Sequence, residues 1–186
     1  RIAGHVIVEK KRQQFGIIGA TTPNLSYIAR AGNVVVDADL VTVVQKKIDT
    51  LLDRNIDKII LVSHLQGLAE DKALISQLSG IDIAIAGGSN DILANPGSLL
   101  LPGEKAGGAY PILVKDLSGR NVPIVTTGGE YRYVGRLVVS FDDASGEITR
   151  IDPDSGPIRV AGGDHPDAVP PDPDIQGRVT LPVQTY

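Results

Sequence analysis

The chain contains no cysteine, no methionine and no tryptophan. Without cysteine there is no disulfide, no thiolate metal site and no cysteine nucleophile. Aromatic residues make up only 4% of the sequence, which argues against a surface that stacks nucleic-acid bases. These absences exclude several kinds of chemistry, but they do not fix the compartment in which the protein works.

Long hydrophobic runs and basic clusters are missing as well. No apolar run approaches the roughly 20 residues that a membrane-spanning helix needs. The 18 lysines and arginines are scattered, and the net charge is −4. We therefore expect neither a membrane span nor a nucleic-acid polymer as partner.

The lack of methionine is informative because the chain begins at Arg1. It leads us to expect that further residues precede this chain in the original translation product. They would be either a short segment, such as a signal or a tag, or a substantial N-terminal piece of the protein. The residues alone favour neither.

Helical and strand-like segments alternate in the first half of the chain. Apolar residues at helical spacing predict helices over 37–57, with Asp39 as N-cap, and over 70–80, with Gly80 as the stop. Short apolar runs predict strands at 5–10, 13–24, 58–64 and 81–91. The alternation predicts parallel pairing through right-handed crossovers. The run at 58–64 lacks polar alternation, so we expect it to be covered on both faces.

The second half has a different character. A loop rich in Gly and Pro (93–111) precedes short strand-like runs at 111–116, 122–128, 136–142 and 147–152, and 141–148 is typical of a hairpin connection. From Asp152 onward Pro and Asp dominate, which indicates an extended surface connector. The predicted fold class is α/β: parallel strands with crossover helices, followed by antiparallel strands, over 1–151, with a connector over 152–186.

Polar residues follow three of the apolar runs, at Thr21–Asn24, Ser63–His64 and Gly87–Asp91. In open parallel sheets, ligands bind outside the carboxyl ends of the strands. His64 should therefore face the same rim as Ser89, Asn90 and Asp91, where an imidazole, an amide and a carboxylate suit a metal or a phosphate. Two simpler interpretations stay open: a histidine held by structural hydrogen bonds, and a plain turn at 87–91.

The order of these pieces resembles the metallophosphoesterase (calcineurin-like) domain of the 5′-nucleotidase family. That family includes secreted bacterial nucleotidases and alkaline-phosphatase-like enzymes. "FGIIGATTPN", "DKIILVSHLQGLAEDKAL", "GIDIAIAGGSNDIL" and "VPIVTTGGEYRYVGRLVVSFDDASGEI" look like successive stretches of its second half. "PDPDIQGRVTLPVQTY" resembles the start of its linker helix to a C-terminal domain. The resemblance covers nearly the whole chain and implies a partial metallophosphoesterase-like sandwich.

This resemblance implies a site for two divalent metal ions, assembled from both halves of the domain. The first half supplies Asp-x-His, a Gly-Asp pair and Gly-Asn-His-Asp/Glu, and neither of the two histidine motifs occurs here. The second half supplies a histidine after the strand, here His64, and the outer positions of Gly-Gly-His-x-His, here Ser89 and Asp91. Serine is a poor ligand for a transition metal, whereas aspartate suits harder cations. Zn, Mn, Mg and Ca are therefore not distinguished.

The altered motif has two interpretations. It marks a subfamily that uses carboxylate ligands, with Asn90 joining His64 and Asp91, or it marks a degenerate site. Family likeness implies that the parent hydrolyses phosphate esters or nucleotides. It also implies that the parent is periplasmic, extracellular or cell-surface bound. The expected partner is a complementary N-terminal fragment, without which we expect little or no activity. The alternatives are a non-catalytic α/β anion-binding module and a scaffold domain.

Overall fold

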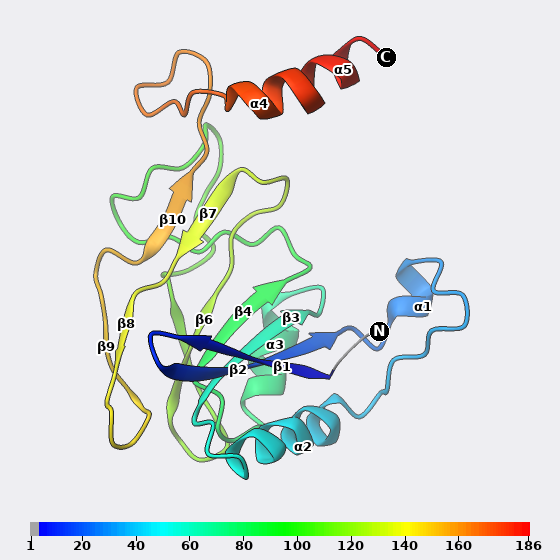
Figure 1. Ribbon diagram of the computed structural model, residues 1–186, viewed down its shortest axis with the longest axis vertical. Helices are drawn as coiled ribbons and strands as arrows, with labels where there is room; N and C mark the ends of the chain where they lie inside the picture. Colours follow the sequence, from blue (N-terminus) through cyan, green and yellow to red (C-terminus); the bar gives the residue numbers. More distant parts are fainter. Residues whose placement is uncertain (1–3) are drawn as a thin grey trace.

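The computed structural model describes residues 4–186, and its centre is a six-stranded sheet in the order β1-β2-β3-β4-β6-β5 (Figure 1). Strands β2, β3, β4 and β6 pair in parallel, and β1 and β5 add to the two edges in antiparallel fashion. Their bounds are β1 (His5–Lys10), β2 (Gln13–Thr21), β3 (Lys58–His64), β4 (Ile83–Gly87), β5 (Ile112–Lys115) and β6 (Asn121–Val125). The predicted α/β class, a sheet with both parallel and antiparallel strands, is confirmed, with β1 adding an antiparallel strand ahead of the parallel ones.

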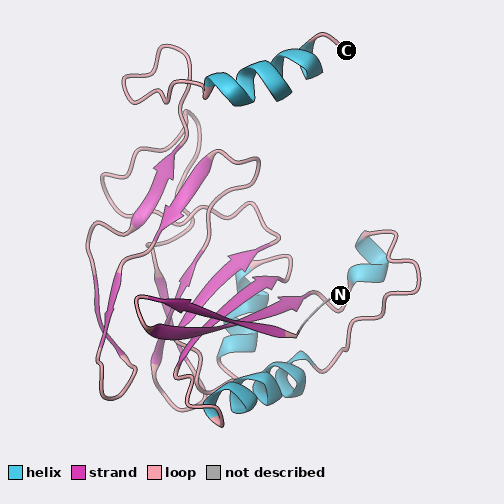
Figure 2. Cartoon of the chain, viewed as in Figure 1, coloured by secondary structure: helices cyan, strands magenta, loops and turns pink. Residues whose placement is uncertain are grey.

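Four further strands form two antiparallel ribbons (Figure 2). They are β7 (Tyr133–Arg136) with β10 (Gly156–Arg159), and β8 (Val139–Phe141) with β9 (Ile148–Ile151). The predicted hairpin at 141–148 is confirmed, because Phe141 and Ile148 are partners in the ladder. Strand β10 lies inside the segment expected to be an extended connector, so that segment is not wholly irregular. The division of the chain after residue 151 stays a prediction.

The helices are α1 (Leu25–Ile28), α2 (Leu40–Leu52), α3 (Leu68–Ile75), α4 (Pro173–Ile175), the π-helical turn η1 (Gln176–Thr180) and α5 (Leu181–Gln184). Asp39 caps α2 as predicted, accepting a hydrogen bond from the Thr42 N–H at 3.0 Å. Helix α3 ends well before Gly80, because Ser76 and Gln77 turn their side chains back onto the Ala73 carbonyl. Within residues 4–186, no helix has the length and apolar character to cross a bilayer.

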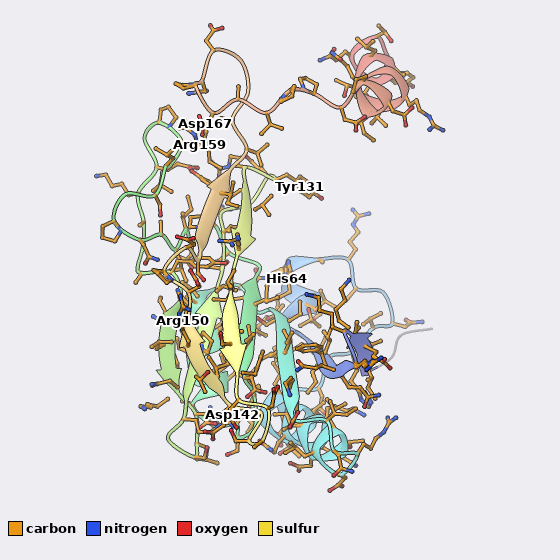
Figure 3. The ribbon with its side chains drawn as sticks, turned by 60° about the vertical axis from the view of Figure 1, so that its left-hand side comes forward. His64, Tyr131, Asp142, Arg150, Arg159 and Asp167 are labelled. Carbon is orange, nitrogen blue, oxygen red and sulfur yellow. The ribbon has the colours of Figure 1, made fainter. Side chains whose placement is uncertain are left out.

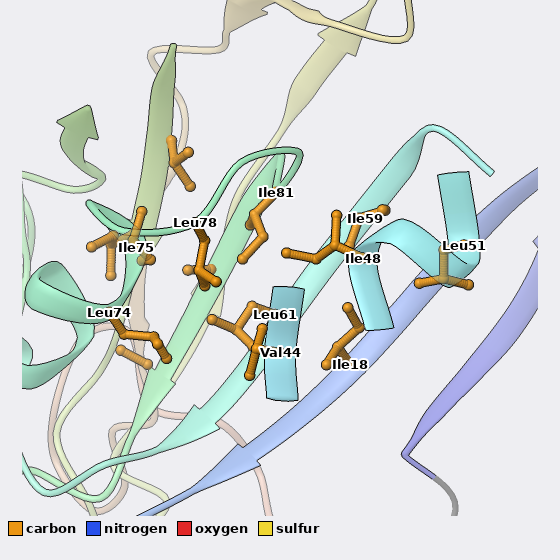
Figure 4. Packing of buried hydrophobic residues seen from close by; sticks show 14 of the residues in the cluster. Ile18, Val44, Ile48, Leu51, Ile59, Leu61, Leu74, Ile75, Leu78 and Ile81 are labelled. Carbon is orange, nitrogen blue, oxygen red and sulfur yellow. The ribbon is translucent and has the colours of Figure 1, made fainter. Parts of the chain in front are cut away.

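Helices α2 and α3 cover one face of the sheet, which we call the helix face (Figure 4). Strands β2, β3 and β4 follow one another across the sheet in the order in which they occur in the chain. Right-handed crossovers between them therefore place both connecting helices, α2 and α3, on the same side of the sheet. Alternate residues of the strands point into this layer. The most deeply buried members of the cluster, all at 0–1% exposure, include Ile18, Ile48, Leu51, Ile59, Leu61, Ile75 and Leu78.

The opposite face, which we call the open face, is only partly covered within the described residues. The strand register places on it the apolar side chains of Val6, Val8, Ile17, Ile60, Val62 and Ile85. Lys58, at the start of β3, is 7% exposed beneath Phe141 of β8, whereas Val62 is 39% exposed and Ile85 44%. The expectation that 58–64 is covered on both faces is therefore wrong for the carboxyl end of β3, because both crossover helices lie on the other side.

Candidate functional site

Strand β3 delivers His64 to the carboxyl end of the sheet (Figure 3). Alternation along the strand puts His64 on the open face with Ile60 and Val62, whereas Ser63 points toward α3. The carbonyl oxygen of His64 accepts a hydrogen bond from the Thr22 N–H at 3.0 Å, which ties two strand ends together. His64 is exposed, so its side chain is accessible to a ligand.

Beneath His64, the end of β3 is held by a buried carboxylate that sequence reasoning missed. Asp71, in the first turn of α3, is 1% exposed and accepts a hydrogen bond from the Ser63 hydroxyl. Burial raises the pKa of the Asp71 carboxyl, and the hydrogen bond from Ser63 opposes that change. A signal was present: Asp71 has the helical spacing of Leu74 and Leu78, which places it on the buried side.

The end of β4 meets His64 directly. Gly87 is the ladder partner of His64, and Gly88 follows with a φ of +89°, a conformation that L side chains rarely adopt. A Cβ on Gly88 would lie 3.0 Å from His64 Nδ1, so a side chain there would crowd the imidazole. The glycine at this position therefore leaves room for the histidine ring.

His64, Ser89 and Asn90 line one cavity of about 580 Å³ at the carboxyl ends of β3 and β4. The structure thus brings together residues that the sequence predicted would share a rim. The other lining residues are Thr22, Leu25, Ile28, Ala29, Gln66, Gly88 and Gly129. Thr22 shapes a turn, since its hydroxyl accepts a hydrogen bond from the Asn24 N–H at 3.2 Å.

Asp91 is placed differently from the other predicted site residues. It is half-buried and is not among the residues that line this cavity. Its backbone N–H donates to the Ser89 hydroxyl at 3.3 Å, in the turn that follows β4. The turn interpretation of 87–91 and the ligand interpretation of His64 and Asn90 are therefore compatible. A ligand role for Asp91 stays a prediction.

The polar side chains among the described residues that line the cavity are one imidazole, amides and hydroxyls, with no carboxylate. Within residues 4–186, no three His, Asp or Glu side chains are grouped closely enough to hold a metal ion. Imidazole nitrogen and amide oxygen are suitable donors for a divalent cation, but a complete site needs at least four ligands. The described residues therefore fit part of a metal's donor set, and metal binding by His64, Asn90 and Asp91 stays a prediction.

The residues in and before β7 complete the surroundings of the site. Tyr133 is buried, at 6% exposure, whereas Tyr131 is 96% exposed. Arg136 donates a hydrogen bond to the carbonyl oxygen of Asp154 at 2.9 Å. No sequence pattern indicated Gly129, which lines the cavity from the loop between β6 and β7.

Comparison with known proteins gives the same family from sequence and from structure. Bovine 5′-nucleotidase is 31% identical over 166 residues, which is 88% of this chain and 27% of that protein. The crystal structure of a 5′-nucleotidase precursor from Thermus thermophilus superposes with a TM-score of 0.76 at 31% identity, over 84% of this chain and 29% of the other. No family model matches the chain.

A calcineurin-like phosphoesterase from Bacillus subtilis shares the fold, with a TM-score of 0.65 at 18% identity over 100% of this chain and 58% of the other. The chain spans only about a quarter of the length of the curated relatives that it matches, for example 23% of rat 5′-nucleotidase. This chain belongs to the 5′-nucleotidase family, corresponds to the C-terminal part of the domain that it matches there, and shares the fold of the calcineurin-like phosphoesterase.

Proposed function

We propose that this chain supplies one part of the active site of a metal-dependent phosphoric ester hydrolase that acts on nucleotides or related phosphate monoesters. The observation that carries the proposal is the cavity in which His64 from β3 meets Asn90 and Ser89 from the end of β4. Neighbouring parallel strands deliver these groups to one rim, which is where ligands bind in such sheets.

In this proposal, His64 is a metal ligand through a neutral imidazole nitrogen. Asn90 contributes its amide oxygen, and Asp91, which is not among the lining residues, is a ligand or orients one. Two bound divalent ions would activate water for attack on the phosphorus and offset the developing negative charge. Because the described lining is uncharged, the proposal takes its carboxylate ligands from elsewhere in the protein. The donor set does not select among Zn, Mn, Mg and Ca.

The open face supports the further proposal that a complementary N-terminal segment completes the domain. Val62 and Ile85 are apolar, central in the sheet and exposed, so covering them is favourable by about 25 cal/mol for each Å² removed from water. The cavity lies at the end of this same face, because His64 is two residues after Val62 on β3 and therefore points to the same side of the sheet. A segment that covers the face would therefore also reach the site, and without it we expect the chain to have little or no hydrolase activity.

Reconstitution tests this proposal. The chain would be mixed with a polypeptide that carries the Asp-x-His and Gly-Asn-His-Asp/Glu motifs, in the presence of Mn²⁺ or Zn²⁺. Hydrolysis of p-nitrophenyl phosphate and adenosine 5′-monophosphate should appear only in the mixture. His64→Ala should abolish it, whereas His165→Ala, a change outside the cavity lining, should not. Full activity of the His64→Ala mixture would contradict the proposed ligand role.

A second candidate is a non-catalytic module that binds a small anion or a protein partner. The uncharged lining of the cavity favours it, since amides and hydroxyls can hold an anion without any metal. Titration with inorganic phosphate, with and without divalent metal, separates the candidates. Metal-independent binding that His64→Ala weakens, without hydrolysis in any mixture, would support the module.

The location of the protein is also a proposal. By family likeness we place it in the periplasm, outside the cell or on the cell surface. Fractionation of the source cells, with an antibody against this chain, tests the assignment. Recovery of the chain in the cytosolic fraction alone would contradict it.

A further inference from the structure

The loop between β6 and β7, residues 126–132, forms a wall of the cavity. Gly129 is the member of this loop that lines it together with His64 and Asn90. The backbone comes so close that a Cβ added to Gly129 would lie 3.0 Å from Asn90 Oδ1. The position of Gly129 therefore limits where the Asn90 amide can lie.

This loop has an unfavourable backbone conformation. Glu130 and Tyr131 have φ values of +64° and +56°, the left-handed region that costs a non-glycine residue about 1 kcal/mol or more. The Tyr131 ring cannot stabilise the loop by packing, because it is 96% exposed and projects from the ribbon in Figure 3. Contacts elsewhere must hold the loop in this shape.

Arg132 makes those contacts. Its Nε donates to the carbonyl oxygen of Gly129 at 3.1 Å, and its Nη1 pairs with the Glu104 carboxylate. Glu104 is held in turn by the hydroxyl of Tyr133, which accepts a hydrogen bond from the Leu101 N–H at 2.7 Å. The carboxylate is well shielded, since the Glu104 side chain is only 14% exposed. Glu104, which belongs to the long 93–111 loop, thus holds Arg132 in the position from which it binds the Gly129 carbonyl.

We propose that the Glu104–Arg132 pair is a positioning device that sets Gly129, and through it the Asn90 side chain, at the wall of the cavity. Neither charged residue lines the cavity, so neither is assigned a contact with the ligand. The inference rests on the site of the proposed function. The effect that it predicts is a change in the position of the Asn90 side chain, which can be observed before any metal or ester binds.

The test is the NMR spectrum of the ¹⁵N-labelled 186-residue chain, with the Asn90 side-chain NH₂ signals assigned by their loss in Asn90→Asp. Arg132→Gln and Glu104→Gln should shift or broaden these signals by more than a line width. Arg132→Lys should do so less, because lysine keeps the charge but loses the fork that reaches both Gly129 and Glu104. Unchanged Asn90 signals in a folded Arg132→Gln protein would overturn the proposal.

A matched control exists in the same region. Arg159 pairs with Asp167 and also donates to the carbonyl of Leu100, so it anchors the same long loop without touching Gly129. Asp167→Asn should lower the melting temperature but leave the Asn90 signals in place. An equal shift of the Asn90 signals in Asp167→Asn would show that any loosening of this region moves them, and would overturn the specific role of Arg132.

Gly129→Ala provides a second route that leaves the ion pair intact. The added methyl group would meet Asn90 Oδ1, so the same NH₂ signals should shift even if Arg132→Gln proves too unstable to study. In the reconstituted hydrolase, Arg132→Gln should lower activity by roughly ten- to hundredfold, as loss of an orienting partner does. If no mixture hydrolyses an ester but the Asn90 signals move as expected, the proposed function fails and the positioning role stands.

Discussion

The two faces of the central sheet are built from the same strands, yet they differ in what covers them. On β3, Leu61 points to the helix face and is 0% exposed, whereas its neighbour Val62 points to the open face and is 39% exposed. The helix face is complete because its partners, α2 and α3, are the connections between consecutive strands. On the open face, Phe141 of β8 packs against Phe15 and Lys58 at one end, whereas Val62 and Ile85 near the carboxyl end have no such cover within the described residues.

Polar residues follow the same division. Ser63 is buried on the helix face against Asp71, and its role is to hold the strand end. His64, one residue later, is exposed on the open face and lines the cavity. The helix face, with its complete hydrophobic core, therefore holds the end of β3 in place, and the open face carries the His64 side chain that lines the cavity.

The largest expected effect is on the helix face. Leu61→Ala should lower the free energy of unfolding by about 2 to 5 kcal/mol, because a fully buried leucine leaves a cavity among the residues of α2 and α3. Urea denaturation followed by circular dichroism measures it. A loss below about 1 kcal/mol would mean that Leu61 is not tightly packed between the sheet and the two helices.

A buried carboxylate at the start of β4, opposite the site, should make stability depend on pH. Burial raises the pKa of Asp82 to about 6, while its hydrogen bond from the Ile59 N–H (2.8 Å) and the nearby Arg120 oppose the rise. A carboxyl whose pKa is higher in the folded state stabilises the fold at low pH, and that stability is lost as pH rises through the folded value.

Relative to Asp82→Asn, the wild-type chain should therefore lose up to about 3 kcal/mol of unfolding free energy between pH 4 and pH 6, and little above that. Asparagine is a suitable reference because its oxygen can still accept from Ile59. Denaturation midpoints over this pH range provide the measurement. A difference between the two proteins that does not change with pH would contradict the assignment.

A smaller effect is expected for the polar contact beneath the site. Ser63→Ala removes the hydroxyl that donates to Asp71 and leaves a buried carboxyl oxygen without its donor, at a cost of about 1 to 3 kcal/mol. Adding Asp71→Leu to the same chain should recover part of this loss. Full additivity of the two changes in a double-mutant cycle would show that the side chains do not interact.

The smallest effect is expected on the open face. Val62→Ala should change the unfolding free energy of this chain by less than about 1 kcal/mol, since the side chain is partly in water already. With the complementary segment bound, the same change should weaken association measurably in isothermal titration calorimetry. Equal binding by the wild-type and Val62→Ala chains would mean that the segment does not cover this face.

Much of the helix face was predictable from the sequence. The spacing of Val44, Ile48 and Leu51 indicates α2, and the apolar runs indicate β2, β3 and β4, because local periodicity and burial coincide there. The burial of β3 on both faces was mispredicted because an apolar run shows which side chains avoid water. It does not show which segment covers them.

The candidate site was predictable only in part. His64 and Asn90 meet in one cavity because parallel strands end at one edge, which is a general rule. The position of Gly129 at the cavity and its contact with Arg132 were not predictable, because both depend on a turn with positive φ at Glu130 and Tyr131. The pairing of Arg132 with Glu104 across the fold was not predictable either. Glycine usually occupies such positions, and the letters "EY" carry no sign of the turn.

The hairpin of β1 and β2 has a consequence for how copies of this chain meet in solution. Strand β1 is one of the two edge strands of the sheet, and the charged run Glu9–Arg12 occupies its last two positions and the turn that follows. An exposed edge strand can pair with a second sheet, and charged residues at that edge oppose such pairing. We therefore expect this charged run to disfavour the pairing of two copies through this end of β1.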